Sequence, residues 1–144
     1  MKTSASRKSL DDALLESVKA GDVGRVRDSL SAGADIHAQE DRALRWAAER
    51  GYLEMVRLLL DSGADLHADR NRALRKSVAN DRLDATMLLV DHGADLEVGI
   101  ACAWVAGKDE ILHLLSKVKR AREERWELSI EVPEPEQADR RIRM

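Results

Sequence analysis

Residues 51–66 read GYLEMVRLLLDSGADL, and the pattern of this stretch recurs before and after it. Its Gly-Ala-Asp triplet begins at Gly33, Gly63 and Gly93, always 30 residues apart, and the flanking residues match as well. A fixed period of this length is typical of solenoid proteins, in which each unit buries its apolar face against the next one. We therefore expect a stack of similar units.

Within one unit, small and apolar residues at helical spacing predict two short helices joined by a tight turn at Gly51. Gly63 follows the second helix, where a left-handed C-cap suits a residue without Cβ, and Asp65 is placed to bond the following backbone in an Asx turn. The first stripe comprises Ala43, Leu44, Ala47 and Ala48, and the second comprises Leu53, Val56, Leu59 and Leu60.

The stretch from Gly51 to Leu66 resembles the second half of an ankyrin repeat. The consensus opening Thr-Pro-Leu-His-x-Ala is replaced here by the segments 42–47 and 72–77, and the period is 30 residues rather than 33. In this respect the chain is similar to the short repeats of large-virus ankyrin proteins. The resemblance implies an all-α solenoid of about four helix-turn-helix units with short hairpin loops.

The resemblance divides the chain into a repeat domain with an extension at each end. We expect a flexible N-terminus over residues 1–8, and Ser9 with Asp12 as a capping-box start of the first helix. The third unit has Asn80 near the turn, which predicts a left-handed Asn or a distorted turn, and the fourth unit lacks a hairpin. The repeats are expected at 9–38, 39–68, 69–98 and 99–120, and a C-terminal extension at 121–144.

Residues Trp126–Val132 alternate apolar and polar side chains with a period of two, which predicts a short β-strand that ends at Pro133. Two roles remain open for this segment. It folds back as a cap over the fourth unit, or it lends a strand to a partner, which includes another copy of the chain.

Composition favours an all-α protein and excludes several classes of function. Only 3% of the 144 residues are aromatic and none is Phe, so the core is aliphatic. The net charge of -3 lacks the strong positive field that non-specific nucleic-acid binding needs. Cys102 is the only cysteine, which excludes an internal disulfide and predicts a reducing, cytoplasmic location. No stretch is long and apolar enough to predict a membrane span.

No motif for catalysis or for a cofactor emerges. His37 and His67 occupy equivalent places in neighbouring repeats, too far apart for one zinc ion, so we interpret both as structural. Cys102 and His113 are expected on different helices without a third orienting group. We expect no metal, no cofactor and no enzymatic activity, with an unrecognised hydrolase as a remaining alternative.

The repeat places several cations in columns, which suggests a basic ladder. Its members are Arg42, Arg45, Arg72, Arg75 and Lys76. One interpretation is an anion-binding surface for nucleic acid or an acidic protein. The interpretation that we favour is that these side chains bond loop carbonyls and the carboxylates of Glu40, Asp41, Asp65 or Asp69. Trp46 and Trp104 are expected to pack into the core.

The resemblance further implies a non-catalytic protein-interaction module, an adaptor or inhibitor, that grips its partner with the hairpin tips and the exposed face of the first helices. These residues are mixed in charge and poor in aromatic side chains, which predicts a polar contact rather than a large apolar hot spot. The matching positions are Lys19, Gln39, Glu40, Asp41, Glu49, Arg50, Asp69, Arg70, Asn71, Ala79 and Asn80, together with Trp126 from the extension.

Overall fold

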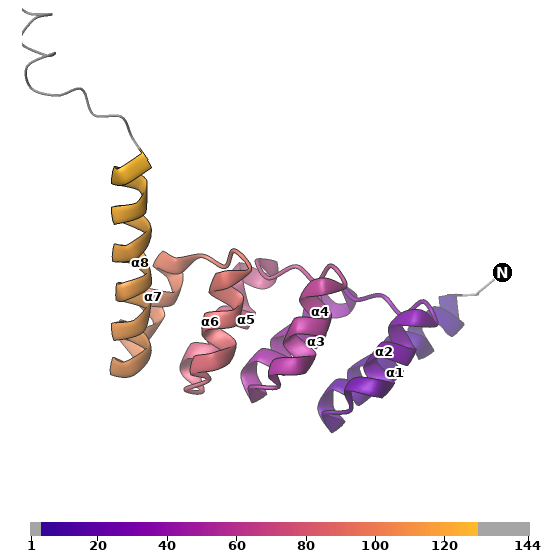
Figure 1. Cartoon of the computed structure of the whole chain (residues 1–144). Helices are drawn as coiled ribbons and strands as arrows, with labels where there is room; N and C mark the ends of the chain where they lie inside the picture. Colours follow the sequence, from indigo (N-terminus) through magenta and orange to yellow (C-terminus); the bar gives the residue numbers. More distant parts are fainter. Residues whose placement is uncertain (1–3, 130–144) are drawn as a thin grey trace, which may run out of the picture.

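The protein is a row of four helical hairpins, which stand side by side (Figure 1). The computed structural model describes residues 4–129 of the chain, with side chains for residues 8–127. Within this range all regular structure is α-helical. The helices are α1 (Ser4–Ala20), α2 (Val23–Ser31), α3 (Ala38–Arg50), α4 (Leu53–Asp61), α5 (Ala68–Ala79), α6 (Leu83–Asp91), α7 (Leu96–Ala106) and α8 (Asp109–Ser129).

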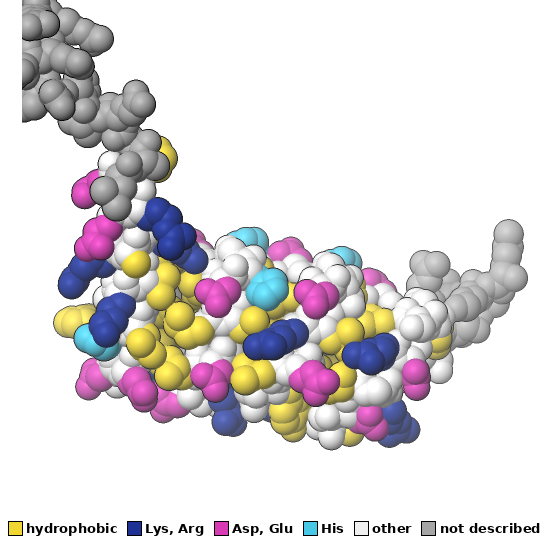
Figure 2. All heavy atoms as spheres, in the orientation of Figure 1, with side chains coloured by type: hydrophobic (Ala, Val, Ile, Leu, Met, Phe, Trp, Pro, Cys, Tyr) yellow, Lys and Arg dark blue, Asp and Glu magenta, His cyan; other side chains and the backbone are white. Residues whose placement is uncertain are grey.

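The helices form two layers. The first helices α1, α3, α5 and α7 each pack against the next one along the row, and the second helices α2, α4 and α6 do the same. The second helices lie in front in Figure 1, and charged side chains of both signs are scattered over their outer face in Figure 2. The all-α solenoid that the resemblance implies is thus confirmed.

The turns follow the predicted chemistry with one exception. Gly51 takes a left-handed φ of 73° as the C-cap of α3, and the Asp65 carboxylate accepts the His67 N–H at 2.9 Å, as an Asx turn requires. In the third unit the left-handed residue is Asp81, with φ 57°, and not Asn80, with φ -98°. Asn80 instead donates its side-chain amide to the Lys76 carbonyl at 2.8 Å.

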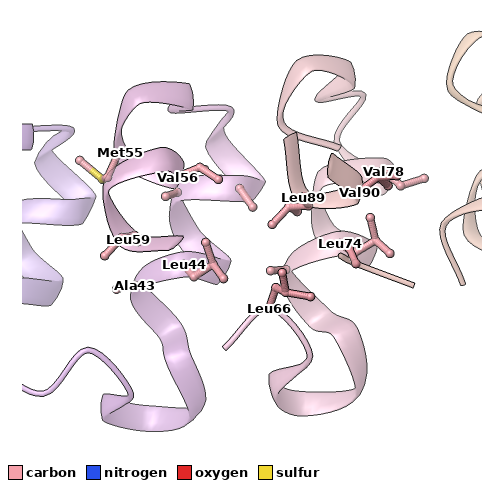
Figure 3. Packing of buried hydrophobic residues seen from close by; sticks show 14 of the residues in the cluster. Ala43, Leu44, Met55, Val56, Leu59, Leu66, Leu74, Val78, Leu89 and Val90 are labelled. Carbon is pink, nitrogen blue, oxygen red and sulfur yellow. The ribbon is translucent and has the colours of Figure 1, made fainter. Parts of the chain in front are cut away.

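The core runs through the stack as one continuous cluster. Leu44 and Leu74 sit at equivalent places in α3 and α5, and each is fully buried beside apolar residues of the second helix of its own unit (Figure 3). Small residues such as Ala47 and Ala48 are also fully buried, which lets neighbouring helices approach closely. Burial of one such leucine contributes about 1.5–3 kcal/mol.

The first helix begins earlier than predicted. Ser4–Lys8 already belong to α1, so Ser9 lies inside the helix and is not its N-cap. No Gly or Pro interrupts this segment, and Ala, Arg and Lys are strong helix formers. Residues 4–8, for which the sequence predicts a flexible N-terminus, are thus helical, and residues 1–3 lie outside the described range.

The strand prediction is wrong for the part of it that the structure describes. Trp126–Ser129 form the end of α8, a single helix of 21 residues that runs past the level of its neighbours (Figure 1). An established helix adds each further residue at little cost, and residues 120–128 contain only Arg, Ala, Glu, Trp and Leu, so nothing stops it before Ser129. Residues 130–132 of the predicted strand lie outside the described range.

Candidate functional site

Two hairpin tips project from the row, and both have an unusual backbone. Gln39, Glu40 and Asp41 have φ values of 54°, 58° and 54°, and Asp69–Asn71 follow the same course with φ values of 51–60°. Each tip is a short left-handed turn built without glycine. Left-handed residues with a Cβ cost roughly 1–2 kcal/mol each, so other contacts have to hold these turns in place.

Asp41 holds the first tip and does not face solvent. Its carboxylate accepts the Asp65 N–H at 2.8 Å and contacts His37 Nδ1 at 2.9 Å. Asp41 is only 5% exposed, so its carboxylate offers little surface to the partner that it was predicted to contact. The loop at the end of the same unit packs over this one carboxylate. Gln39 and Glu40 beside it are exposed.

Arginine side chains hold the second tip. The Asp69 carboxylate accepts hydrogen bonds from Arg72 at 2.9 Å and from Arg45 at 3.5 Å. Arg75 donates to the carbonyls of Arg70 at 3.0 Å and of Asp69 at 3.3 Å. The hydrogen bond from Arg72 is the main reason that the pKa of Asp69 lies below its usual value.

The favoured interpretation of the basic ladder is thus confirmed for Arg45, Arg72 and Arg75, which bond a loop carboxylate and loop carbonyls. Only Arg45 and Arg72 share the carboxylate of Asp69. Burial lowers the pKa of Arg45, and the charges of Arg72 and Arg42 lower it further, while Asp69 and Glu49 counteract part of this shift. The ladder arginines therefore repel one another.

Trp46 packs against the core, as predicted. The Lys19 ammonium lies 4.8 Å from the centre of a Trp46 ring, and the Arg42 guanidinium lies 5.5 Å from it. Arg42 Nε is buried and has no hydrogen-bond partner among the described residues. The cation–π contact offsets part of that cost.

The ends of the first helices connect neighbouring units. Arg50 donates to the Lys19 carbonyl at 2.7 Å, and Arg82 donates to the Glu49 carbonyl at 3.1 Å. Arg50 and Lys19, which the resemblance places on the binding face, therefore also hold the stack together. Asn71 is half-buried, and its side-chain oxygen contacts His67 Nδ1 at 3.0 Å. Arg70 and Asn80 are exposed.

The predicted core role of Trp104 is wrong. Trp104 is 73% exposed and the next residue, Val105, is 86% exposed. The places equivalent to Trp104 are Ala48 and Val78, and both are fully buried. No unit follows α7 and α8 within the described residues, so the side that earlier units bury stays open here.

An apolar groove of about 360 Å³ lies between α5 and α7 on the first-helix side. The repeat explains why it exists. In the first groove Lys19 lies over the ring of Trp46, whereas the counterparts of these two residues in the third groove are Ala79 and Cys102. The smaller side chains occupy less of the space between the helices in the third groove. Arg75, Ala79, Ala101, Cys102, Val105 and Ala106 line it.

Comparison with known protein families identifies the family to which this repeat belongs. The sequence profile described as ankyrin repeats (3 copies) matches residues 14–99, which is more than half of the chain. The chain is an ankyrin-repeat protein. Its fourth unit, α7 with α8, lies almost wholly beyond the matched residues, and it has no left-handed tip because α7 begins directly after Asp95, whose carboxylate caps it. A search of curated proteins gives no match.

Ankyrin repeats are generally protein–protein interaction modules, and the family is typically non-catalytic. In the described part of this ankyrin-repeat protein, no three His, Cys, Asp or Glu side chains lie close enough together to hold a metal ion. Burial raises the pKa of the Cys102 thiol, which disfavours the reactive thiolate. None of the helices within residues 4–129 is both long and apolar enough to cross a membrane.

Trp126 lies near the far end of α8 and is 67% exposed. Trp126 is not among the residues that line the groove between α5 and α7. Sequence reasoning missed Val105 and the groove. The signal was present, since α7 carries only one charged residue, Glu97, where the other first helices carry several.

Proposed function

We propose that this ankyrin-repeat protein is a non-catalytic adaptor or inhibitor that captures a protein partner on its first-helix face. The observation that carries the proposal is the apolar groove between α5 and α7, which adjoins the strongly exposed Val105. Exposed apolar surface beside polar residues is typical of the centre of an interface. The face is also the one on which ankyrin proteins bind their partners.

The hairpin tips form the rim of this surface. Glu40 and Arg70 are exposed, and hydrogen bonds within and between units hold the backbone of both tips. A surface that is already ordered loses little conformational entropy when a partner binds, so a larger share of the contact energy remains as affinity. Capture then masks or tethers the partner without any chemical step.

The proposal is tested by cross-linked capture from an extract of the native cell. Val105→Glu places a charge on the exposed face without disturbing the core, and it should abolish capture of the specific partner. Arg57→Glu, an exposed change on α4, is the matched control and should leave capture intact. Equal capture by the wild type and Val105→Glu would remove this face from consideration.

The tips are tested separately. Simultaneous charge reversal at Glu40 and Arg70 should weaken capture while the helical circular dichroism is retained, and Arg50 stays unchanged because its side chain bonds the Lys19 carbonyl. Asp41 is left unchanged in this variant because its carboxylate is buried. Undiminished capture would confine the interface to the groove.

A further inference from the structure

We propose that the groove between α5 and α7 binds a partner segment that presents one large apolar side chain next to carboxylates. This inference rests on the proposed function and specifies the chemistry of the partner. The groove supplies an apolar floor, and Arg75 lies at its edge. Its volume of about 360 Å³ is at the lower end of ligand-binding cavities, which suits a single bulky side chain rather than a whole helix face.

The cationic side chains of α5 favour a partner segment that carries carboxylates. Helix α5 carries four cationic side chains, Arg70, Arg72, Arg75 and Lys76, against the single carboxylate of Asp69, a net charge of +3 in a chain whose total is -3. Asp69 already accepts hydrogen bonds from Arg72 and Arg45. Within the described residues, no carboxylate pairs with Arg75, whose hydrogen bonds go to neutral carbonyls.

An acidic segment therefore gains twice on this surface. Its apolar side chain leaves water in the groove, and its carboxylates meet Arg75, whose hydrogen bonds go to backbone carbonyls. A basic segment would face the repulsion of α5. A nucleic acid would satisfy the charge of α5 but has no side chain suited to an apolar hollow, and the face has no set of stacking aromatic residues.

A displayed library of random peptides tests the inference. It is selected on the full chain and counter-selected on a variant with Ala79→Lys and Cys102→Trp, which transplants the Lys19–Trp46 pair of the first groove into the third. We call this double variant the plugged variant. Sequences that bind the full chain but not the plugged variant should combine a bulky apolar residue with neighbouring Asp or Glu. Neutral or basic groove-dependent sequences, or none at all, would overturn the inference.

A synthetic peptide with the most strongly selected sequence then measures how much charge contributes to the affinity for the groove. Ala79→Glu should weaken its binding about tenfold or more, because a carboxylate enters the groove edge where Glu49 stands one unit earlier. Ala79 is exposed and Glu49 occupies the same place, so this variant should fold even where the plugged variant does not. Arg57→Glu on α4 is the matched control and should bind as the wild type does.

Two further outcomes separate the inference from the proposed function. Steep, salt-dependent binding of a DNA or RNA oligonucleotide that competes with the peptide would overturn the choice of an acidic protein segment. If Val105→Glu loses partner capture but Ala79→Glu still binds the peptide as the wild type does, the first-helix face remains the proposed interaction surface. The same result would contradict the proposal that its partner segment is acidic.

Discussion

Asp41 and Asn71 stand at the same place in successive units. In both, a side-chain oxygen lies within hydrogen-bond distance of Nδ1 of the histidine four residues before it. Only Asp41 also accepts a backbone N–H from the following loop, that of Asp65. Asp11 repeats this bond to the Asp35 N–H at 2.7 Å. A single carboxylate thus connects the beginning of one repeat to the end of the same repeat, 24 residues later.

Asp41→Ala should lower the free energy of unfolding by about 1–3 kcal/mol, because the Asp65 N–H loses its acceptor in a partly buried place. Asp41→Asn keeps an acceptor oxygen and should cost clearly less. Urea denaturation of both variants measures the difference. Equal losses would mean that the negative charge, and not the hydrogen bond, holds the tip.

Ser77 and Thr86 are the polar pair inside the third unit. Both are fully buried, and their hydroxyls lie 2.9 Å apart. The second unit has Ala47 and Val56 at these places. Ser77→Ala with Thr86→Val should therefore be neutral within about 0.5 kcal/mol or stabilising, since both polar partners leave together.

Leu89→Ala, in the same helix as Thr86, provides the scale for that experiment and should cost about 2–5 kcal/mol. A double variant of Ser77 and Thr86 that lost a comparable amount of stability would show that the hydroxyl pair is needed for packing in the third unit.

At the scale of elements, the left-handed backbone of the tips lowers the stability of the protein. Arg70→Gly removes the Cβ that opposes a φ of 56° but leaves the Arg70 carbonyl that Arg75 binds. The relief of about 1–2 kcal/mol exceeds the extra entropy of glycine in the unfolded chain, so a net gain of about 0.5–1 kcal/mol is expected. Thermal unfolding followed by circular dichroism measures it.

Arg57→Gly serves as the control for this change, because Arg57 is exposed in the middle of α4 and glycine should cost about 1 kcal/mol there. Destabilisation by both glycines would contradict the strained tip.

The last turns of α8 are an element without a place in the core. The side chains of residues 121–127 are all exposed, so Glu124→Ala should change the free energy of unfolding by less than about 0.5 kcal/mol. Leu115→Ala, a change at a fully buried place of the same helix, should be strongly destabilising. Urea denaturation of both variants measures the difference, and a large loss of stability from Glu124→Ala would contradict an exposed end of α8.

For the whole molecule, the position of a helix in the row decides how firmly it is held. Helices α3 and α5 pack against first helices on both sides, whereas α1 and α7 each have one such neighbour among the described residues. Amide hydrogens in α3 and α5 should therefore exchange most slowly, with faster exchange in α7. Hydrogen exchange followed by mass spectrometry measures this gradient, and uniform protection would contradict a stack of nearest-neighbour contacts.

The sequence by itself determined the repeat, its helical hairpins and most of its turns. These features depend on local chemistry: Leu and Ala at helical spacing, a glycine at a left-handed turn, and the Asp65 carboxylate within reach of the backbone two residues later. Local chemistry is the same whether or not a neighbouring unit is present, so it can be read from the sequence.

Burial, in contrast, was decided by the tertiary structure. Asp41 is polar and is buried because the following loop docks on it, while Trp104 is apolar and is exposed because no unit covers it within the described residues. The groove between α5 and α7 likewise exists because both of these helices line it with small side chains, Ala79 from α5 and Cys102 from α7. Which surfaces remain open depends on what packs beside them, and a side chain's own chemistry does not contain that information.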